Sequence, residues 1–483
     1  MRSPFFNRLA IIIAGLVIGS SGLWSCSSYS ASEEISNPDP PDELSFPTFF
    51  QLTATETETQ QPPEKLEFNT ENSYFVSTSG SDQNPGTIEQ PWKTIQKAAN
   101  SLVGGETLYI RGGTYNEQVN LAYRDNSSGS YSTFINFPGE SVILDGTGID
   151  IQHGEGLFSI KASDYIRVTG LRVQHSNGAG IYVLNSNNIR IDHNSTYDTV
   201  KSGIGIWRGA NVVVDGNDIA LACNAHPNYY ASEENISIAA SSSNVEVKNN
   251  YVHQAANINT GYAGGEGINV KDGSHDIQVH HNIVRLDERA DEKDSTRLAF
   301  GLDAWQSETY NVRFYNNIAY NNAVGFVVES EAGATARDIY VYNNIAYNNG
   351  IGFYIPNWAQ NETSLKKNIY FVNNTAYNNG RGFYINSVKI DNVVIHNNLL
   401  WQNGTAVVIE AGVPVTEISQ QYNLSNQDPL FVNASAGDFH LKSGSPAIDA
   451  GYHQYAPTTD MDGNLRPQDN GYDIGADEFT SNQ

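Results

Sequence analysis

From about residue 133 the chain repeats one short pattern in which apolar and polar residues alternate. The repeats place Val, Ile or Phe at every second position, as in YIRVTGLRV, NIRIDHN, NVVVDGN, NVEVKNN, DIQVHHN, NVRFYNN, DIYVYNN, NIYFVNN and NVVIHNN. Alternation of this kind predicts strands with one buried face. Because the pattern recurs, we expect the strands to stack as copies of one structural unit.

Each unit contains an asparagine just after the alternating strand. These marker asparagines are Asn194, Asn217, Asn250, Asn282, Asn317, Asn344, Asn374 and Asn398, at successive intervals of 23, 33, 32, 35, 27, 30 and 24 residues. The shortest intervals match a three-strand turn of a parallel β-helix, and the longer ones contain insertions. We expect the marker asparagine to adopt a left-handed conformation and its amide to hydrogen-bond along the stack. The predicted fold class is all-β, a right-handed parallel β-helix solenoid of roughly 9–10 coils.

The flanking segments have other patterns, and they divide the chain into parts. Residues 67–132 contain strand phrases at 74–76 and 107–110 and an amphipathic helix that opens after Pro91, which predicts an N-terminal cap with a helix. Residues 133–425 form the predicted β-helix, and the turn-rich residues 426–483 an irregular C-terminal cap. Residues 27–66 are rich in Ser, Thr, Glu and Pro, which predicts a flexible linker.

The first 26 residues have the pattern of a targeting signal. Arg2 and Arg8 precede an apolar run at 9–19, and Leu23-Trp24-Ser25-Cys26 follows. This arrangement resembles a bacterial lipoprotein signal, which implies that Cys26 carries lipid; a secretory signal or an uncleaved anchor is the alternative. We therefore expect an extracytoplasmic protein, either a cell-envelope lipoprotein or secreted, that meets a membrane only through this anchor. Cys223 is the other cysteine, so no disulfide is expected.

The charge balance limits the partners of the protein. The chain has 53 Asp and Glu against 27 Lys and Arg, a net charge of −26. Such a balance argues against binding to nucleic acid or to anionic membranes. It is compatible with a polysaccharide or oligosaccharide partner, and we expect a monomer.

Three phrases between residues 264 and 331 place a reactive side chain on the outward row of a predicted strand. Lys271, Asp303 and Glu329 each stand four residues after a small residue, in GGEGINVKDG, AFGLDAWQSE and VGFVVESEAG. If these strands stack, the three side chains form a column. Long insertions enter the same edge of the same strand in neighbouring coils, and such insertions would build walls around a groove.

The column predicts paired-carboxylate chemistry. Neighbouring strands lie about 4.8 Å apart, which suits the roughly 5–5.5 Å carboxylate separation of retaining glycosidases. A second register of Asp303, counted from Gly301, would suit the roughly 6.5–9.5 Å of inverting enzymes. Lys271 should favour ionised Asp303, and Asp303 should make Glu329 harder to ionise. The alternative interpretation is an exposed ladder of ions without catalysis.

Other side chains are candidates by position. Glu266 is an additional catalytic acid. Six residues are expected to bind substrate, by hydrogen bonds or by stacking of rings on sugars: Asn269, Glu234, Trp207, Trp305, Tyr354 and Trp358, with Tyr384 as a further ring. Asp460, Asp462 and Asn464 alternate as oxygen ligands do in a calcium loop, although the distal Glu of such a loop is missing.

Residues 74–479 resemble the bacterial right-handed β-helix proteins of the pectin-lyase-like class, many of which act on polysaccharides. Within the band, AFGLDAW followed by GFVVES is similar to the β-helix glycoside hydrolases of the β-xylosidase type. That resemblance implies Asp303 as nucleophile and Glu329 as acid/base. EGINVK also resembles the D-G-x-x-x-K phrase of calcium-dependent pectate lyases, but their Asp pair is replaced here by Ala299-Phe300, and no Lys or Arg base follows.

Three hypotheses follow. The first is a glycoside hydrolase, which requires no cofactor and in which Lys271 is an electrostatic neighbour of Asp303 and no base. The second is a Ca²⁺-dependent polysaccharide lyase. The third is a glycan-binding surface protein without catalysis.

Overall fold

The computed structural model describes residues 72–124, 126, 129–152, 154–224, 234–254, 265–286, 297–358 and 364–480. Contacts divide the chain into two units, 1–66 and 67–483. The predicted targeting signal, Cys26 and the linker lie outside the described residues. No helix in the described part is long and apolar enough to cross a membrane.

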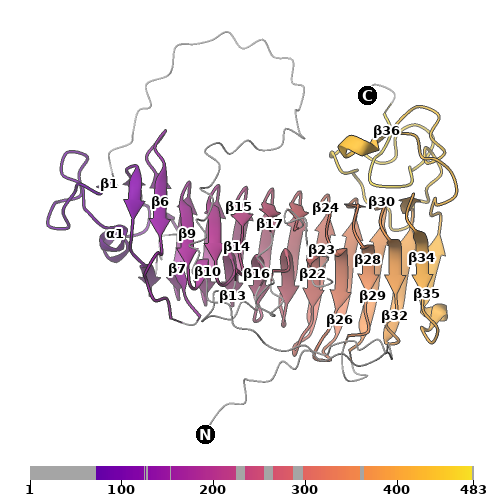
Figure 1. Ribbon diagram of the computed structural model, residues 1–483, viewed down its shortest axis with the longest axis horizontal. Helices are drawn as coiled ribbons and strands as arrows, with labels where there is room; N and C mark the ends of the chain where they lie inside the picture. The colour runs from indigo at the N-terminus through magenta and orange to yellow at the C-terminus, as the bar shows by residue number, and fades with distance from the viewer. Residues whose placement is uncertain are drawn as a thin grey trace, which may run out of the picture. The chain divides into compact units, whose positions relative to one another are not determined.

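Three parallel sheets make up most of the described chain, and from β2 to β35 successive strands belong to successive sheets (Figure 1). Sheet A contains β1 (Ser73–Val76), β2 (Thr107–Ile110), β5 (Ser132–Asn136), β8 (Asp164–Thr169), β11 (Asn187–Asp192), β14 (Ala210–Asp215), β17 (Ser243–Lys248), β20 (His275–His280), β23 (Thr309–Tyr315), β26 (Ala336–Tyr342), β29 (Lys366–Val372), β32 (Ile390–His396) and β35 (Ile418–Gln421). Sheet B contains β3 (Gly113–Tyr115), β6 (Val142–Asp145), β9 (Arg172–Ser176), β12 (Ser195–Thr199), β15 (Asp218–Ala220), β18 (Tyr251–His253), β21 (Ile283–Arg285), β24 (Ile318–Tyr320), β27 (Ile345–Tyr347), β30 (Thr375–Tyr377) and β33 (Leu399–Trp401). Sheet C contains β4 (Val119–Ala122), β7 (Gly156–Lys161), β10 (Ala179–Leu184), β13 (Ile204–Trp207), β16 (Ile236–Ala239), β19 (Ile268–Lys271), β22 (Leu298–Asp303), β25 (Val324–Glu329), β28 (Ile351–Ile355), β31 (Arg381–Ile385) and β34 (Thr405–Ile409).

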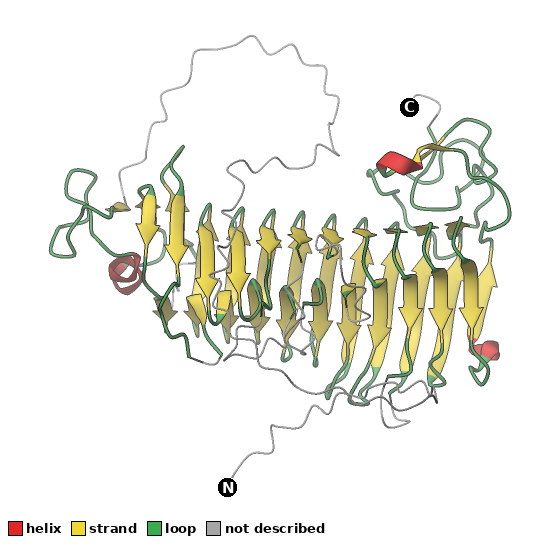
Figure 2. Cartoon of the chain, viewed as in Figure 1, coloured by secondary structure: helices red, strands yellow, loops and turns green. Residues whose placement is uncertain are grey.

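The predicted β-helix is confirmed, and the stack is longer than the 9–10 coils expected. Among the described residues the three sheets hold 13, 11 and 11 strands. β2, β3 and β4 pair with β5, β6 and β7, so the stack already includes strands before residue 133. The predicted helix α1 (Ile95–Ser101) buries Ile95, Ala98 and Ala99 at this end (Figure 2).

The core lies inside the coil, on the alternating apolar positions. Ile189 and Ile191 of β11 are fully buried, as are Val212 and Val214, their partners in β14. Under the middle of sheet C, Phe300, Phe326, Phe353 and Phe383 stack with ring centroids 4.8–5.1 Å apart. Stacks of this kind fix the register, because a slip by one residue would move every apolar side chain to the other face.

The marker asparagines form the predicted ladder along the stack. Asn317 shows the pattern: its backbone N–H and its Nδ2 both donate to Oδ1 of Asn344, each at 3.0 Å. The left-handed residue, however, is the one before the marker. Asn316 has φ 55°, as do its equivalents His193 and Asn249. The marker side chain can point along the ladder because its neighbour, not the marker itself, turns the chain.

The spacing of the coils requires a small residue at or near the start of several strands of sheet C, such as β19 and β25. A Cβ at Gly325 would lie 2.6 Å from the carbonyl oxygen of Gly352 in the next coil. A Cβ at Gly267 would lie 2.3 Å from the carbonyl oxygen of Ala299. The chain therefore turns from sheet B into sheet C where backbones touch, and this fixes where the outward row of sheet C begins.

The C-terminal cap is irregular, as predicted. It contains η2 (Ala434–Ala436) and the antiparallel pair β36 (Phe431–Asn433) and β37 (Asp438–Leu441), whereas η1 (Val415–Glu417) comes earlier, just before β35 of the coil. Three left-handed asparagines of the coil, Asn343, Asn373 and Asn397, each donate from Nδ2 to a cap carbonyl at 2.8 Å. These bonds attach the cap to the last coils.

Candidate active site

Lys271, Asp303 and Glu329 form one row on sheet C. Lys271 of β19 pairs with Asp303 of β22, and Asp303 pairs with Glu329 of β25. This is the register counted from Ala299, and the alternative counted from Gly301 is wrong. Since neighbouring strands lie about 4.8 Å apart, the backbones of the two carboxylates are separated by one strand spacing.

The outer face of sheet C is covered around the row. Leu298, Val324, Val327, Tyr354 and Tyr384 form a buried apolar cluster on β22, β25, β28 and β31. Asp303 is 2% exposed and Glu329 1%. The prediction of an exposed ion ladder is therefore wrong, because both carboxyl groups lie in a region from which water is largely excluded.

Lys271 is held by Glu234 and not by Asp303. Its Nζ lies 2.5 Å from Glu234 Oε1, and Ser237 Oγ donates to Glu234 Oε2 at 2.7 Å. Burial lowers the pKa of Lys271. The charges of Glu234, Glu266 and Asp303 raise it by more than burial lowers it, so the pKa lies above its usual range. Lys271 is thus a fixed cation. Both oxygens of Glu234 are engaged inside the protein, and its role as a substrate ligand stays a prediction.

Asp303 is held by two backbone donors. Its Oδ1 accepts the N–H of Trp305 at 2.8 Å and that of Glu331 at 3.1 Å. Lys271 lowers the pKa of Asp303, as predicted, and so do these two donors. Burial is the larger effect and raises it, so the net pKa lies above 3.8. The carboxyl is nevertheless the better prepared of the two to carry a negative charge.

Glu329 has different surroundings. Its Oε2 is buried and has no hydrogen-bond partner among the described residues. Burial, and then the charges of Asp303 and Glu266, raise the pKa of Glu329 well above 4.5. The predicted effect of Asp303 on Glu329 is confirmed in direction. Of the two carboxyl groups, Glu329 is the one whose surroundings, among the described residues, give no hydrogen-bond donor to its charged form.

Lys366 is a residue that the sequence analysis missed. It is fully buried at the start of β29, where the neighbouring coils have Ala336 and Ile390. Its Nζ donates to Ser364 Oγ at 3.1 Å. Burial lowers the pKa of Lys366 to about 8, and Glu329 and Asp303 act in the opposite direction. The pairing of β29 with its neighbours identifies Lys366 as an inward residue of the repeat.

Glu266 and Asn269 border the row on the side of β19. Asn269 Nδ2 donates to Glu266 Oε2, while Asn269 Oδ1 is buried without a partner among the described residues. Burial first, and then the charge of Glu234, raise the pKa of Glu266 to about 8. These surroundings favour the protonated form of Glu266, and its role as an additional acid stays a prediction.

The aromatic candidates lie on both sides of the row. Tyr354 pairs with Val327 of β25 and stacks on Tyr384 at 4.8 Å, and Trp358 meets Tyr354 edge to face at 5.4 Å. Trp358 is 39% exposed, so it is the ring of this group that a sugar can reach. Trp207 lies at the other side on β13, and Trp305 contributes its backbone N–H to Asp303.

The insertions enter one edge of sheet C, as predicted. Residues 225–233, 255–264 and 287–296 each follow a strand of sheet B and precede a strand of sheet C. They lie outside the described residues. Four histidines of the region belong to the other sheets or their turns: His253, His275, His280 and His281.

A possible metal cluster of the described residues lies away from the row on sheet C. Within the described ranges, the three-residue group of His, Cys, Asp or Glu whose ligand atoms lie close enough for one ion is in the C-terminal cap. The predicted calcium loop differs from a cation site. Asp460 accepts four N–H donors, one of them Nδ2 of Asn464, so the Asn464 side chain serves as a donor there.

Comparison with protein families gives a match on the first half of the coil. Residues 74–240 match the family described as Pel9A-like, right-handed beta helix region. This matched range ends before Lys271, Asp303 and Glu329. It supports the scaffold, and it contains none of these three residues.

Curated relatives cover short segments. One is pectate lyase PEL9 of Emericella nidulans, 30% identical over 141 residues, which are 27% of this chain and 34% of that protein. Another is the uncharacterized protein YwoF of Bacillus subtilis, 32% identical over 120 residues, which are 23% of this chain and 25% of that protein. The matches thus span between a quarter and about a third of these relatives.

Solved structures share the fold over most of the chain. Pectate lyase Pel9A has a TM-score of 0.56 at 14% identity, with 84% of this chain and 96% of that one covered. The GH136 lacto-N-biosidase of Eubacterium ramulus has a TM-score of 0.50 at 15% identity, with 74% and 68% covered. The fold is therefore one on which both a pectate lyase and a glycosidase are built. The chain has the right-handed parallel β-helix fold that these structures share.

Proposed function

We propose that this pectin-lyase-like β-helix protein is a glycoside hydrolase that cleaves a polysaccharide or oligosaccharide with Asp303 and Glu329 as its paired carboxylates. The observation that carries the proposal is their direct pairing in unlike surroundings. Asp303 accepts two backbone N–H groups, whereas Glu329 Oε2 accepts none from the described residues. Paired carboxyl groups with unlike environments take acid and base roles in glycosidases.

The roles follow from these surroundings. Glu329 begins protonated and gives its proton to the leaving glycosidic oxygen, while Asp303 attacks the anomeric carbon and forms a glycosyl ester. Glu329, now ionised, takes a proton from water, and the hydroxide displaces Asp303 from the sugar. The close register favours this retaining course. Lys271 remains protonated and stabilises charge on Asp303.

A polysaccharide lyase is the second candidate, favoured by the 30% identity to pectate lyase PEL9. The site residues do not fit its calcium-dependent form. The resemblance requires an acidic pair where Ala299 and Phe300 are buried in the core. Lys271, the base candidate of the row, is bound to Glu234 with its pKa raised. We therefore derive no step through calcium.

A screen on neutral and acidic polysaccharides tests the proposal, with Ca²⁺ in one arm and a chelator in the other. The wild type should release new reducing ends in both arms without the ultraviolet absorbance of an unsaturated product. Asp303→Asn and Glu329→Gln should each lose at least about 10³-fold in kcat, as loss of a catalytic group does. Glu417→Gln, at an exposed glutamate in η1, is the matched control and should keep full activity.

Other outcomes would replace the proposal. Unsaturated product that depends on Ca²⁺ would assign a lyase. Glycan binding without turnover, unchanged in both variants, would assign a binding protein. Proton NMR of the first product should show the anomeric configuration of the substrate, and inversion would contradict the nucleophilic role of Asp303.

We further propose that residues 1–26 direct the protein out of the cytoplasm and that Cys26 is lipidated, which rests on the sequence pattern alone. Labelling with a fatty-acid probe should mark the wild type and not Cys26→Ala. Equal labelling of both would refute lipidation at this residue.

A further inference from the structure

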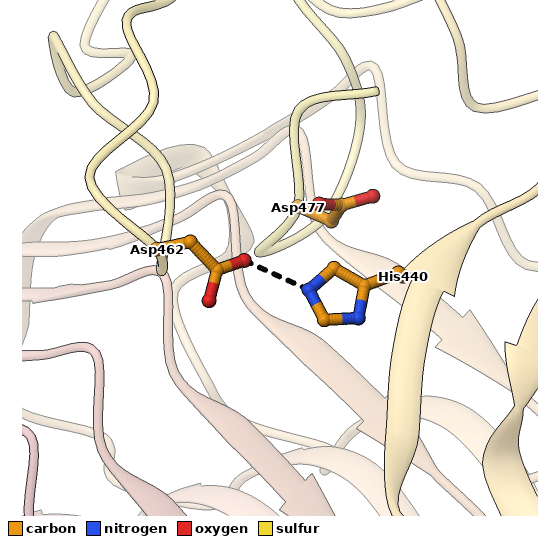
Figure 3. Close-up of side chains that lie close together, drawn as sticks. All are labelled: His440, Asp462 and Asp477. Atoms are coloured by element: carbon orange, nitrogen blue, oxygen red, sulfur yellow. Dashed lines mark hydrogen bonds and ion pairs between the residues drawn. The ribbon is translucent and has the colours of Figure 1, made fainter. Parts of the chain in front are cut away.

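The C-terminal cap brings three side chains together from three separate segments. His440 comes from β37, Asp462 from the turn at 460–464, and Asp477 from the last described segment. One ligand atom of each lies within 4.8 Å of those of the other two (Figure 3). This cluster lies apart from the row on sheet C, and the proposed hydrolysis makes no use of it.

The imidazole of His440 is oriented from both sides. Its Nε2 lies 2.8 Å from Asp462 Oδ2, and its Nδ1 lies 2.6 Å from Asp438 Oδ1. A carboxylate on one ring nitrogen is the usual arrangement behind a metal-binding histidine, because it fixes the ring and the tautomer. Asp438 therefore has the position of this supporting carboxylate on Nδ1, and Nε2 faces Asp462 in the cluster.

Asp477 supplies an observation of another kind. The residue is 2% exposed, and its Oδ2 accepts the N–H of Leu441 at 2.8 Å. Its Oδ1 is buried and accepts no hydrogen bond from the described residues. A buried carboxylate oxygen without a partner costs the folded state free energy. A cation bound between Asp477, Asp462 and His440 would remove that cost.

The charges around the cluster are unbalanced. His440 is the one basic group of the cluster, and four aspartates surround or belong to it: Asp438, Asp460, Asp462 and Asp477. The nearby Arg466 is already paired with Glu478 at 2.7 Å, and both side chains are fully buried. Burial, together with the charges of Asp460 and Asp462, raises the pKa of Asp477 to about 6, although the Leu441 N–H and His440 lower it.

We propose that His440, Asp462 and Asp477 bind one divalent cation of the zinc type, with water as the fourth ligand. One imidazole nitrogen and two carboxylate oxygens suit Zn²⁺, which binds both at about 2.0–2.2 Å. Ca²⁺ is the poorer match, because it prefers six to eight oxygen ligands and no nitrogen. On binding, Nε2 loses its proton, and the metal replaces the contact between His440 and Asp462.

The bound cation would cross-link three segments of the C-terminal cap. It would join β37, the turn at 460–464 and the segment around Asp477, which are distant in sequence. Phe439, next to His440, packs against Tyr347 and Tyr377 of the coil with ring centroids 5.1 and 5.4 Å away. A metal held at His440 would therefore stabilise the contact between the cap and the last coils.

The test uses the full-length protein after removal of metal by a chelator, with Zn²⁺ alone and Ca²⁺ alone as probes in calorimetric titrations. The wild type should bind one Zn²⁺ per chain at this site, and Zn²⁺ should raise its Tm. Asp462→Asn and Asp477→Asn should each weaken that site by at least about 100-fold, and Asp438→Asn by about 10–100-fold. The controls are Asp469→Asn and His453→Gln, two exposed cap residues outside the cluster, which should bind as the wild type does.

Folding and binding can be separated. Asp477→Asn removes an unpaired carboxylate oxygen, so without metal its Tm should equal or exceed that of the wild type, whereas Zn²⁺ should no longer raise it. X-ray absorption of the zinc-loaded wild type should show one imidazole in a shell of light atoms. No Zn²⁺ bound by the wild type, equal binding by the cluster variants, or Ca²⁺ bound there in place of Zn²⁺ would each overturn the proposal.

Discussion

Replacement of Lys366 by methionine tests the electrostatics of the site at a residue that does not touch substrate. Methionine keeps the length of the buried side chain and removes its charge. Lys366 is fully buried, and its Nζ donates to Ser364 Oγ at 3.1 Å. The change therefore removes a buried cation near Glu329 and Asp303 while leaving the packing around the start of β29 nearly intact.

The size of the expected change in stability follows from the lowered pKa of Lys366, which is about 8 against the ordinary 10.5. At about 1.4 kcal/mol per pKa unit, burial of the charged amine costs the folded state about 3 kcal/mol at neutral pH. The unfolded chain binds more protons between pH 8 and 10.5, so this group makes the wild type more stable as pH rises through that window. Lys366→Met should be more stable by up to about 3 kcal/mol at pH 7, and the gain should disappear above pH 10.5.

The assay is chemical denaturation at a series of pH values, followed by the activity profile. Loss of the cation should raise the pKa of Glu329 further and shift the alkaline limb of kcat/KM upward, by roughly one pH unit. The control is Lys367→Met, the next residue, whose Nζ lies 2.7 Å from Asp391 and whose side chain is 43% exposed. That variant should leave both profiles unchanged.

Equal stability of Lys366→Met and wild type from pH 7 to 10.5 would refute this reasoning. A gain in stability without any shift of the alkaline limb would also refute it, because Lys366 would then have no electrostatic interaction with the two carboxylates.

Three further predictions follow. Asn317→Ala should lower stability by about 1–3 kcal/mol, because it interrupts the asparagine ladder, whereas Asn316→Gly should change it little, since glycine accepts the left-handed conformation; thermal denaturation separates the two. Lys271→Met should lower the free energy of unfolding by about 3–5 kcal/mol, because it leaves Glu234 buried and unpaired. The double variant with Glu234→Gln should recover most of that stability. If the double variant does not recover it, the ion pair is not the cause of the loss. Activity should fall as pH rises through the raised pKa of Glu329, since the acid must be protonated, and Glu329→Gln should abolish this limb together with turnover; an alkaline limb that persists in the residual activity would assign it to another group.

The alternation of apolar and polar residues was sufficient to predict the coil and the outward face of the row. It could not choose between the two registers of Asp303, because they differ by two residues and share that face; the strand pairing places Asp303 between Lys271 and Glu329. The marker asparagines could be recognised by their spacing. Their neighbours were not recognised as the left-handed residues, because Asn is tolerated at positive φ and the sequence shows two adjacent candidates in most coils.

The strength of burial could not be predicted in the same way. Lys271 was expected to keep the pKa of Asp303 low, but the surrounding chain excludes water and the net direction is upward. That outcome is set by burial, which outweighs the lowering by Lys271 and by the N–H groups of Trp305 and Glu331 and depends on the packing of neighbouring coils. Lys366 was missed for a related reason: in the phrase KKNIYFV it resembles a surface pair, and only the pairing of β29 with β26 and β32 shows it in place of Ala336 and Ile390.

The most direct test of the central claim is to run the reaction in heavy-oxygen water with a responsive glycan and to determine the products by mass spectrometry. Hydrolysis through Asp303 and Glu329 predicts one heavy oxygen at each new reducing end, in the presence of a chelator and in proportion to turnover. The label should be absent with Asp303→Asn. An unlabelled, unsaturated product, or full labelling by Asp303→Asn, would contradict the account.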